Sequence, residues 1–145
     1  MADSAAPVRA IYIVSDATGE TAEKVVRAAL LQFDLGDQLI DLRMFPHLRH
    51  EHDIDTVVAE ARAAHALLVS TLVRTEEREL LYQKCTAGGV QCVDLLGALL
   101  GSLAGFFGAQ PRGVPGLLHT VSGVYFRRME AIEFTVHGDD GRDPD

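Results

Sequence analysis

The chain has 145 residues, 48% of them hydrophobic, which is enough material for one domain with a substantial core. Its 13 basic and 21 acidic residues give a formal net charge of −8, a balance that argues against a nucleic-acid-binding surface. The first ten residues carry neither an apolar export signal nor a basic leader. Cys85 and Cys92 lack a metal-ligand spacing. We therefore expect a cytoplasmic protein with reduced thiols.

Apolar segments alternate with helical patterns along the chain. The predicted strands are residues 8–14, 39–45, 66–72 and 90–95. The predicted helices are 18–33, 54–65, 75–87, 95–109 and 122–136, with Gly36 ending the first of them. Strands that alternate with helices of this length form parallel sheets covered on both faces. We predict an α/β domain over residues 1–137 with a doubly wound, mainly parallel four-stranded sheet, Rossmann-like or flavodoxin-like, in the strand order 2-1-3-4.

The segment after the first predicted strand carries the clearest functional signal. It is a polar turn, SDATGET (15–21), that leads directly into a helix. Such a turn directs backbone N–H groups and the positive end of a helix dipole at one point, where an anion can bind. We predict a phosphate-binding turn formed by Ser15, Asp16, Thr18, Gly19 and Thr21. Helix capping by Thr18 without any ligand is the alternative.

Polar residues also end two other predicted strands. Ser70 and Thr71 end the third strand, and Asp94 lies in the fourth. Because ligands of such sheets bind beyond the carboxyl ends of the strands, we expect these residues to line one cleft with the first turn. Arg43 is predicted to supply a cation there, and Arg49 is a second candidate, although both could be ordinary surface arginines.

Residues 95–109 (LLGALLGSLAGFFGA) carry no charge. The segment is shorter than the roughly 20 apolar residues of a membrane span, so we expect no membrane insertion. Gly97, Gly101 and Gly105 recur every four residues and line one side of a helix, where they allow close approach of another backbone. The many leucine and phenylalanine side chains of this helix exceed what a small sheet can cover. We predict a homo-oligomer formed through this helix. The alternative is that helix 122–136 covers it.

Four segments in the right order resemble the regulatory proteins of pyruvate, phosphate dikinase and phosphoenolpyruvate synthase. They are VSDATGETAE (14–23), VSTLV (69–73), VDLLGALL (93–100) and YFRRMEAIEFTVHGDDGRDP (125–144). The resemblance implies a bifunctional enzyme that uses ADP to phosphorylate a threonine of the dikinase or synthase. The same enzyme removes that phosphate by phosphorolysis with inorganic phosphate and releases pyrophosphate. ADP and phosphate are thereby implied as ligands of the complete enzyme, and the dikinase or synthase as its partner.

The chain departs from this family at two places. Family members continue into a second domain with a Gly-rich phosphate loop that ends in Lys-Thr. Here the only lysines are Lys24 and Lys84, and neither lies in a G-x-x-x-x-G-K-[ST] context. We therefore expect the N-terminal half of the enzyme, as a fragment or a shortened homologue, without catalytic residues or a cofactor of its own. Residues 138–145 would be an acidic linker toward the absent P-loop kinase domain. The stretch HTVSGVYF (119–126) also lacks the acidic residue that the family tends to carry before its Tyr-Phe pair.

Two other functions are weaker alternatives. The sequence TGET (18–21) is similar to the phosphate loop of flavodoxins, so a stand-alone module that binds phosphate, a nucleotide or flavin is possible. Flavin rings usually stack on aromatic side chains, but the chain has no Trp and residues 71–75 contain no aromatic residue. His47, His50 and His52 are residue types that bind zinc. Because they lie close together in one loop, we interpret them as a solvated polar segment and predict no metal site.

Overall fold

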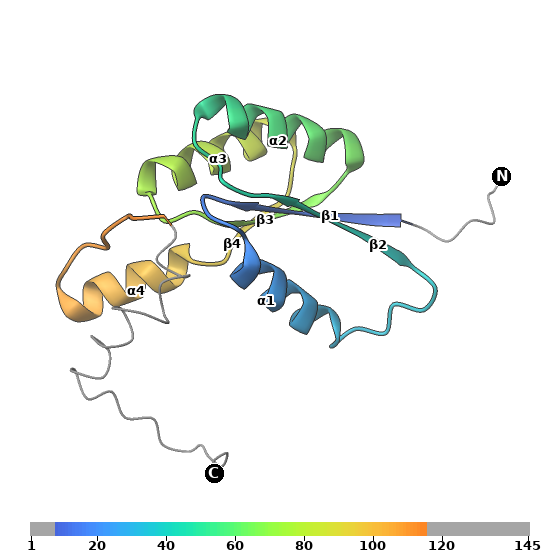
Figure 1. Ribbon diagram of the computed structural model, residues 1–145, viewed down its shortest axis with the longest axis horizontal. Coiled ribbons are helices and arrows are strands. Elements are labelled where there is room, and N and C mark those ends of the chain that lie inside the picture. Colours follow the sequence, from blue (N-terminus) through green and yellow to red (C-terminus); the bar gives the residue numbers. More distant parts are fainter. Residues whose placement is uncertain (1–7, 116–145) are drawn as a thin grey trace, which may run out of the picture. The chain divides into compact units, whose positions relative to one another are not determined.

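The computed structural model describes residues 8–115 of the chain. Strands and helices alternate throughout this part (Figure 1). In chain order the elements are β1 (Val8–Ser15), α1 (Glu20–Leu30), β2 (Leu39–Phe45), α2 (Glu51–Ala64), β3 (Leu67–Thr71), α3 (Thr75–Gly88), β4 (Cys92–Asp94) and α4 (Gly97–Phe107). The predicted helix 122–136 and linker 138–145 lie outside the described residues.

The four strands form one sheet in the order β2-β1-β3-β4, and every neighbouring pair is parallel. The predicted fold class and strand order are therefore confirmed. Ser15 of β1 lies beside Thr71 of β3, and Ser70 lies beside Asp94 of β4. This register brings the carboxyl ends of β1, β3 and β4 to the same edge of the sheet.

Two apolar layers cover the sheet, one on each face. Alternate side chains of a strand point to opposite faces, so Tyr12 and Val14 of β1 pack with α2 and α3, whereas Ile11 and Ile13 pack with α1. Figure 1 shows α2 and α3 together on one side of the sheet and α1 on the other. Burial on both faces explains why the centre of β1 is a continuous apolar run in the sequence.

The first helix is shorter than predicted at both ends. Gly19 has φ +85°, a left-handed conformation, so the helix begins at Glu20 and Thr18 is not its N-cap residue. At the other end Leu31 caps the helix, and the next turn closes with short-range bonds such as Phe33 N to Leu30 O (3.1 Å). The prediction that Gly36 ends this helix is wrong. Gly36 lies in the connecting turn, where its N–H donates to the Asp34 carboxylate (3.3 Å).

Two other boundaries shift for local reasons. α2 begins before the predicted residue 54 because the Asp53 carboxylate accepts the N–H groups of Arg49 (2.9 Å) and His50 (3.0 Å). These bonds satisfy donors that a helix start leaves unpaired, and they lower the pKa of Asp53. β4 begins after the predicted residue 90 because the Val90 N–H donates to the Cys85 carbonyl (2.8 Å) and so closes α3.

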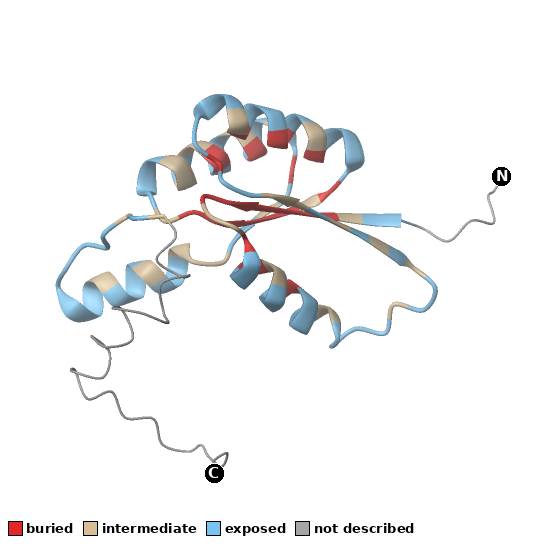
Figure 2. Cartoon of the chain, in the orientation of Figure 1, coloured by how far each residue is buried: buried red, intermediate tan, exposed pale blue. Residues whose placement is uncertain are grey.

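Helix α4 differs from the other three helices in its burial. None of its residues is buried, and Figure 2 shows it in pale blue and tan alone. Four of its large apolar side chains are exposed, namely Leu99, Leu103, Phe106 and Phe107. Among the helices between residues 8 and 115, none has the length and apolar character of a membrane span.

Candidate functional site at the carboxyl edge of the sheet

The carboxyl edge gathers the buried polar side chains of the domain. Within residues 8–115 the buried polar or charged residues are Ser15, Asp16, Ser70 and Thr71, each at most 3% exposed. Three of them end the two central strands, Asp16 directly follows β1, and all four are among the predicted site residues. Polar groups are costly to bury, so their concentration at this edge marks it as the candidate site.

In the turn after β1, some of the backbone N–H groups that could bind an anion already bond to side chains of the same turn. The Ser15 hydroxyl accepts the N–H of Ala17 (2.9 Å), and the Thr18 hydroxyl accepts the N–H of Glu20 (3.3 Å). Two backbone donors that the sequence pattern assigned to a ligand therefore already have partners inside the turn. Thr21 lies exposed in the first turn of α1.

Gly19 is required by this turn for two reasons. Its φ of +85° is rarely adopted by residues with a Cβ atom. A Cβ at this position would also lie 2.7 Å from the Cε atom of Met44 on β2. Gly19 thus fixes the geometry of the turn, whether or not an anion binds there.

Asp16 ties the first turn to two other loops. Its Oδ2 atom accepts the N–H of Val73 (3.0 Å), and its carbonyl accepts a bond from Arg49 Nη1 (2.8 Å). The segment after β2 also contacts the turn, because His47 N donates to Ala17 O (2.7 Å) and Leu48 N donates to Ser15 O (2.9 Å). The Asp16 carboxylate is thus engaged in holding the loops together.

The two candidate arginines differ in position. Arg49 lies against the first turn, as predicted. Arg43 does not reach it: it pairs in register with Tyr12, bonds the Tyr12 hydroxyl (3.3 Å), and lies 3.8 Å from Glu60 of α2. Its guanidinium also stacks over the Tyr12 and Phe45 rings. The observed contacts of Arg43 are therefore with side chains of β1, β2 and α2 and not with the turn after β1.

Arg78 is a functional candidate that the sequence reasoning missed. Its side chain is 17% exposed, donates to the Val73 carbonyl (3.1 Å) and pairs with the Asp94 carboxylate (3.4 Å). A cavity of about 340 Å³ opens beside it, and its wall includes Ser70, Thr75, Arg78, Cys92, Asp94 and Gly97. The other oxygen of Asp94 accepts the N–H groups of Leu96 (3.0 Å) and Gly97 (2.8 Å) at the start of α4. The Arg78 guanidinium, two hydroxyl groups and the start of α4 thus line one cavity.

Glu77 is a second residue that the sequence did not single out. Its Oε1 atom is buried and accepts no hydrogen bond within the described part of the chain. Burial raises the pKa of the Glu77 carboxyl, and the negative charge of Asp16 raises it further. The Arg74 guanidinium, 3.6 Å away, opposes this shift. A partly buried carboxyl group that lies near other charges and has one oxygen atom without a hydrogen bond is typical of functional sites.

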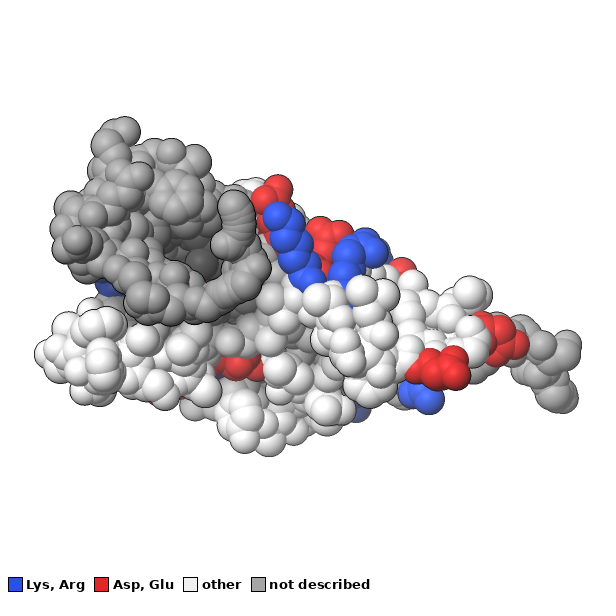
Figure 3. All heavy atoms as spheres, turned by 90° about the horizontal axis from the view of Figure 1, so that it is seen from below, with Lys and Arg blue, Asp and Glu red and all other residues white. Residues whose placement is uncertain are grey.

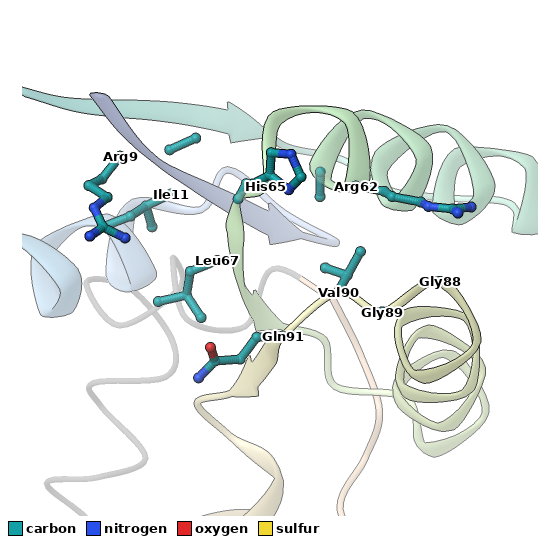
Figure 4. Close-up of a pocket in the computed structure, with 12 residues that line it drawn as sticks. Arg9, Ile11, Arg62, His65, Leu67, Gly88, Gly89, Val90 and Gln91 are labelled. Atoms are coloured by element: carbon teal, nitrogen blue, oxygen red, sulfur yellow. The ribbon is translucent and has the colours of Figure 1, made fainter. Parts of the chain in front are cut away.

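A second cavity, of about 600 Å³, lies at the opposite edge of the sheet (Figure 4). Its wall includes Arg9, Arg62, His65, Gly89 and Gln91, and none of the predicted site residues. In Figure 4 the Arg9 and Arg62 side chains extend away from each other. We therefore place the candidate site at the carboxyl edge, where the buried polar groups converge.

Charges of both signs lie side by side on the surface. On the face seen in Figure 3, basic and acidic side chains are neighbours in the part that is not grey. An example is the Arg27–Glu23 ion pair of α1 (2.9 Å). Between residues 8 and 115, no three His, Cys, Asp or Glu side chains are grouped to hold a metal ion.

Comparison with known proteins identifies the family of this chain. Residues 11–145 match the family described as kinase/pyrophosphorylase. A protein of Shouchella clausii named as a pyruvate, phosphate dikinase regulatory protein is 45% identical over 92% of this chain and 49% of its own length. A protein of the same name from Geobacter sulfurreducens is 42% identical over 94% of this chain and 50% of its own length. The chain spans about half the length of these curated relatives. On this match, which extends from β1 to the last residue, the chain belongs to the kinase/pyrophosphorylase family.

Proposed function

We propose that this chain is the N-terminal half of a cytoplasmic regulatory protein of pyruvate, phosphate dikinase or phosphoenolpyruvate synthase. In the complete enzyme, ADP would serve as the donor for phosphorylation of a target threonine. Phosphorolysis with inorganic phosphate would reverse that reaction and release pyrophosphate. The family match carries this proposal, because the relatives are named for regulation of the dikinase.

The role we propose for this half is to dock the target protein and to contribute an anion-binding surface at the carboxyl edge. Arg78 and Arg49 are the cations of that surface, and Ser70 and Thr71 supply hydroxyls. The observation that supports this role is that every buried polar side chain of residues 8–115 lies there. Guanidinium groups bind phosphate oxygens through paired hydrogen bonds, so a fixed arginine suits this task.

We further propose that this half does not transfer phosphate without a phosphate loop. Phosphoryl transfer depends on positioning and on positive charge at the phosphates, and a P-loop lysine commonly supplies both. Lys84 lies on α3 and pairs with Asp55 (2.7 Å) and Glu51 (3.2 Å) of α2, so its contacts are with carboxylates of the neighbouring helix. The other lysine, Lys24, lies on α1.

Binding and catalysis can be tested separately. The 145-residue chain is titrated calorimetrically with pyrophosphate, phosphate, ADP and flavin mononucleotide, and its binding to the dikinase and to the synthase is measured. We expect binding to one of the two target proteins and to pyrophosphate, with no phosphothreonine formed from ADP. Threonine phosphorylation by this chain would contradict the proposed division of labour, and tight binding of the flavin alone would favour a flavodoxin-like module.

Arg78→Gln tests the anion site against a matched control. Loss of a charge-assisted contact is expected to weaken pyrophosphate binding about tenfold. Arg27→Gln removes the same charge from an exposed ion pair on α1 and should leave binding unchanged. Arg78→Lys, which keeps the charge without the planar fork, should fall between the two. Equal binding by Arg78→Gln and Arg27→Gln, with native circular dichroism for both, would remove Arg78 from the site.

A further inference from the structure

The two cysteines, which the proposed function does not use, lie in a contact between α3 and β4. Arg78 and Cys85 are seven residues apart on α3, which is close to two helical turns, so both face the same side. Cys92 and Asp94 are two residues apart on β4 and therefore also share a face. Arg78 pairs with Asp94 (3.4 Å), and Cys92 packs against the apolar cluster that contains Cys85, with the two thiols in hydrogen-bonding contact. The helix and the strand thus meet through one ion pair and one thiol pair.

The two thiols differ in their surroundings. Cys85 is 1% exposed and belongs to the apolar core between the sheet and α2 and α3. Cys92 packs against the same core but is half-buried and forms part of the wall of the 340 Å³ cavity. A small reagent that enters the cavity therefore reaches Cys92 and not Cys85.

From this arrangement we propose that Cys92 is an oxidation site, where a peroxide converts the Cys85–Cys92 thiol pair into an intramolecular disulfide. The contacts of the sulfur support this assignment. Hydrogen bonds from the Cys85 thiol and the Ser70 hydroxyl lower the pKa of Cys92, whereas burial and the negative charge of Asp94 act in the opposite direction. The pKa of Cys85 is raised by the same thiol pair and by burial. Because Cys92 lines the cavity and Cys85 is buried behind it, we assign Cys92 as the nucleophile and Cys85 as its resolving partner.

The reaction balances with one peroxide for each thiol pair. The Cys92 thiolate attacks a peroxide oxygen, the O–O bond breaks, and the departing hydroxide takes up a proton and leaves as water. Cys92 is now a sulfenic acid, oxidised by two electrons. The Cys85 sulfur then attacks the Cys92 sulfur, the S–OH bond breaks, and the hydroxide leaves as water with the Cys85 proton. The peroxide is reduced and the two thiols are joined in a disulfide.

The experiment uses the 145-residue chain treated with hydrogen peroxide, alkylated with N-ethylmaleimide and weighed intact by mass spectrometry. We expect both thiols to be lost together with the mass of two hydrogen atoms. The product should run as a monomer on a non-reducing gel, keep its circular dichroism spectrum and regain both thiols with dithiothreitol. Retention of both thiols by the folded chain, or a disulfide that joins two chains, would overturn the proposal.

Two single variants assign the order of events. In Cys85→Ser, oxidation should stop at a Cys92 sulfenic acid that dimedone traps. In the matched variant Cys92→Ser, the buried Cys85 should keep its thiol under the same treatment. If Cys85 of that folded variant were oxidised as fast as the wild-type pair, Cys92 would not be the entry point and the proposal would fail.

Discussion

The Asp16 carboxylate and the Val73 backbone N–H are joined by a 3.0 Å hydrogen bond across 57 positions of sequence. This bond links the turn after β1 to the loop after β3. It assigns Asp16 a positioning role at the carboxyl edge, because its carboxylate accepts a backbone donor of the neighbouring loop and its negative charge would repel an anion.

Removal of this carboxylate should destabilise the domain. Asp16→Ala leaves the Val73 N–H without its acceptor in a partly buried position, which costs about 1–3 kcal/mol. Asp16→Asn keeps an oxygen acceptor of the same shape and should lose less. Urea unfolding of the three proteins measures the difference. Equal stability of Asp16→Ala and wild type would mean that the bond contributes nothing.

Substitution of Gly19 should lower the free energy of unfolding by more than the cost of placing a Cβ atom in its left-handed backbone conformation. Gly36→Ala is the matched control, because Gly36 also has a positive φ (+61°) but a Cβ atom added there would meet no atom of the described residues within 4 Å. The left-handed conformation costs about 1–2 kcal/mol in either variant. Gly19→Ala should lose a small amount of additional stability because the end of the Met44 side chain must move, and this excess should disappear when Gly19→Ala is compared with its parent in a Met44→Ala background. Urea unfolding that gives equal losses for both glycines would contradict the role of Met44.

Glu77 should make the stability depend on pH. A carboxyl whose pKa is raised on folding contributes stability that is present below its unfolded value of 4.5 and lost as the pH rises through the folded pKa. Glu77→Gln has no carboxyl to ionise, so it does not lose stability as the pH rises. The variant should be more stable than wild type at neutral pH and similar to it below pH 4.5, the pKa of this carboxyl in the unfolded chain.

Thermal unfolding as a function of pH tests this expectation. Glu76→Gln is the control, because Glu76 lies exposed in the same first turn of α3 and has the same favourable interaction with the helix dipole. A gain at neutral pH in both variants, or in neither, would show that burial of Glu77 is not the cause.

Helix α4 should mediate self-association. Phe106 is 81% exposed, and Phe106→Ser should shift sedimentation toward the monomer at micromolar concentration. Phe33→Ser is the control, because Phe33 is 65% exposed outside α4. A wild-type chain that sediments only as a monomer would refute the self-association.

The sequence predicted the central features of the site for a physical reason. Parallel strands end at one edge, so polar residues that follow apolar runs, such as Ser15, Ser70 and Thr71, must converge there. The role of Gly19 could also be predicted from the sequence, because a glycine between a strand and a helix indicates a positive φ or a close approach of another atom.

The sequence could not predict residue positions that depend on strand register or on which face of a helix meets the sheet. Arg43 falls beside Tyr12 because β2 is aligned with β1 over a connection that no local pattern specifies. Arg78 reaches the edge because α3 presents that side to β4, and the sequence of a helix does not state which strand it will cover. The hydroxyls of Ser15 and Thr18 were predicted to face a ligand, but they also bond backbone N–H groups of their own turn.

The bonds from His47 and Leu48 to the turn after β1 also have a consequence for hydrogen exchange. These two amides, together with Val73, lie in loops, which ordinarily exchange through local fluctuations. Because each donates to the same three-residue turn, we expect their protons to exchange with deuterium only when the whole carboxyl edge opens. Their protection factors should therefore resemble one another and fall together in Asp16→Ala.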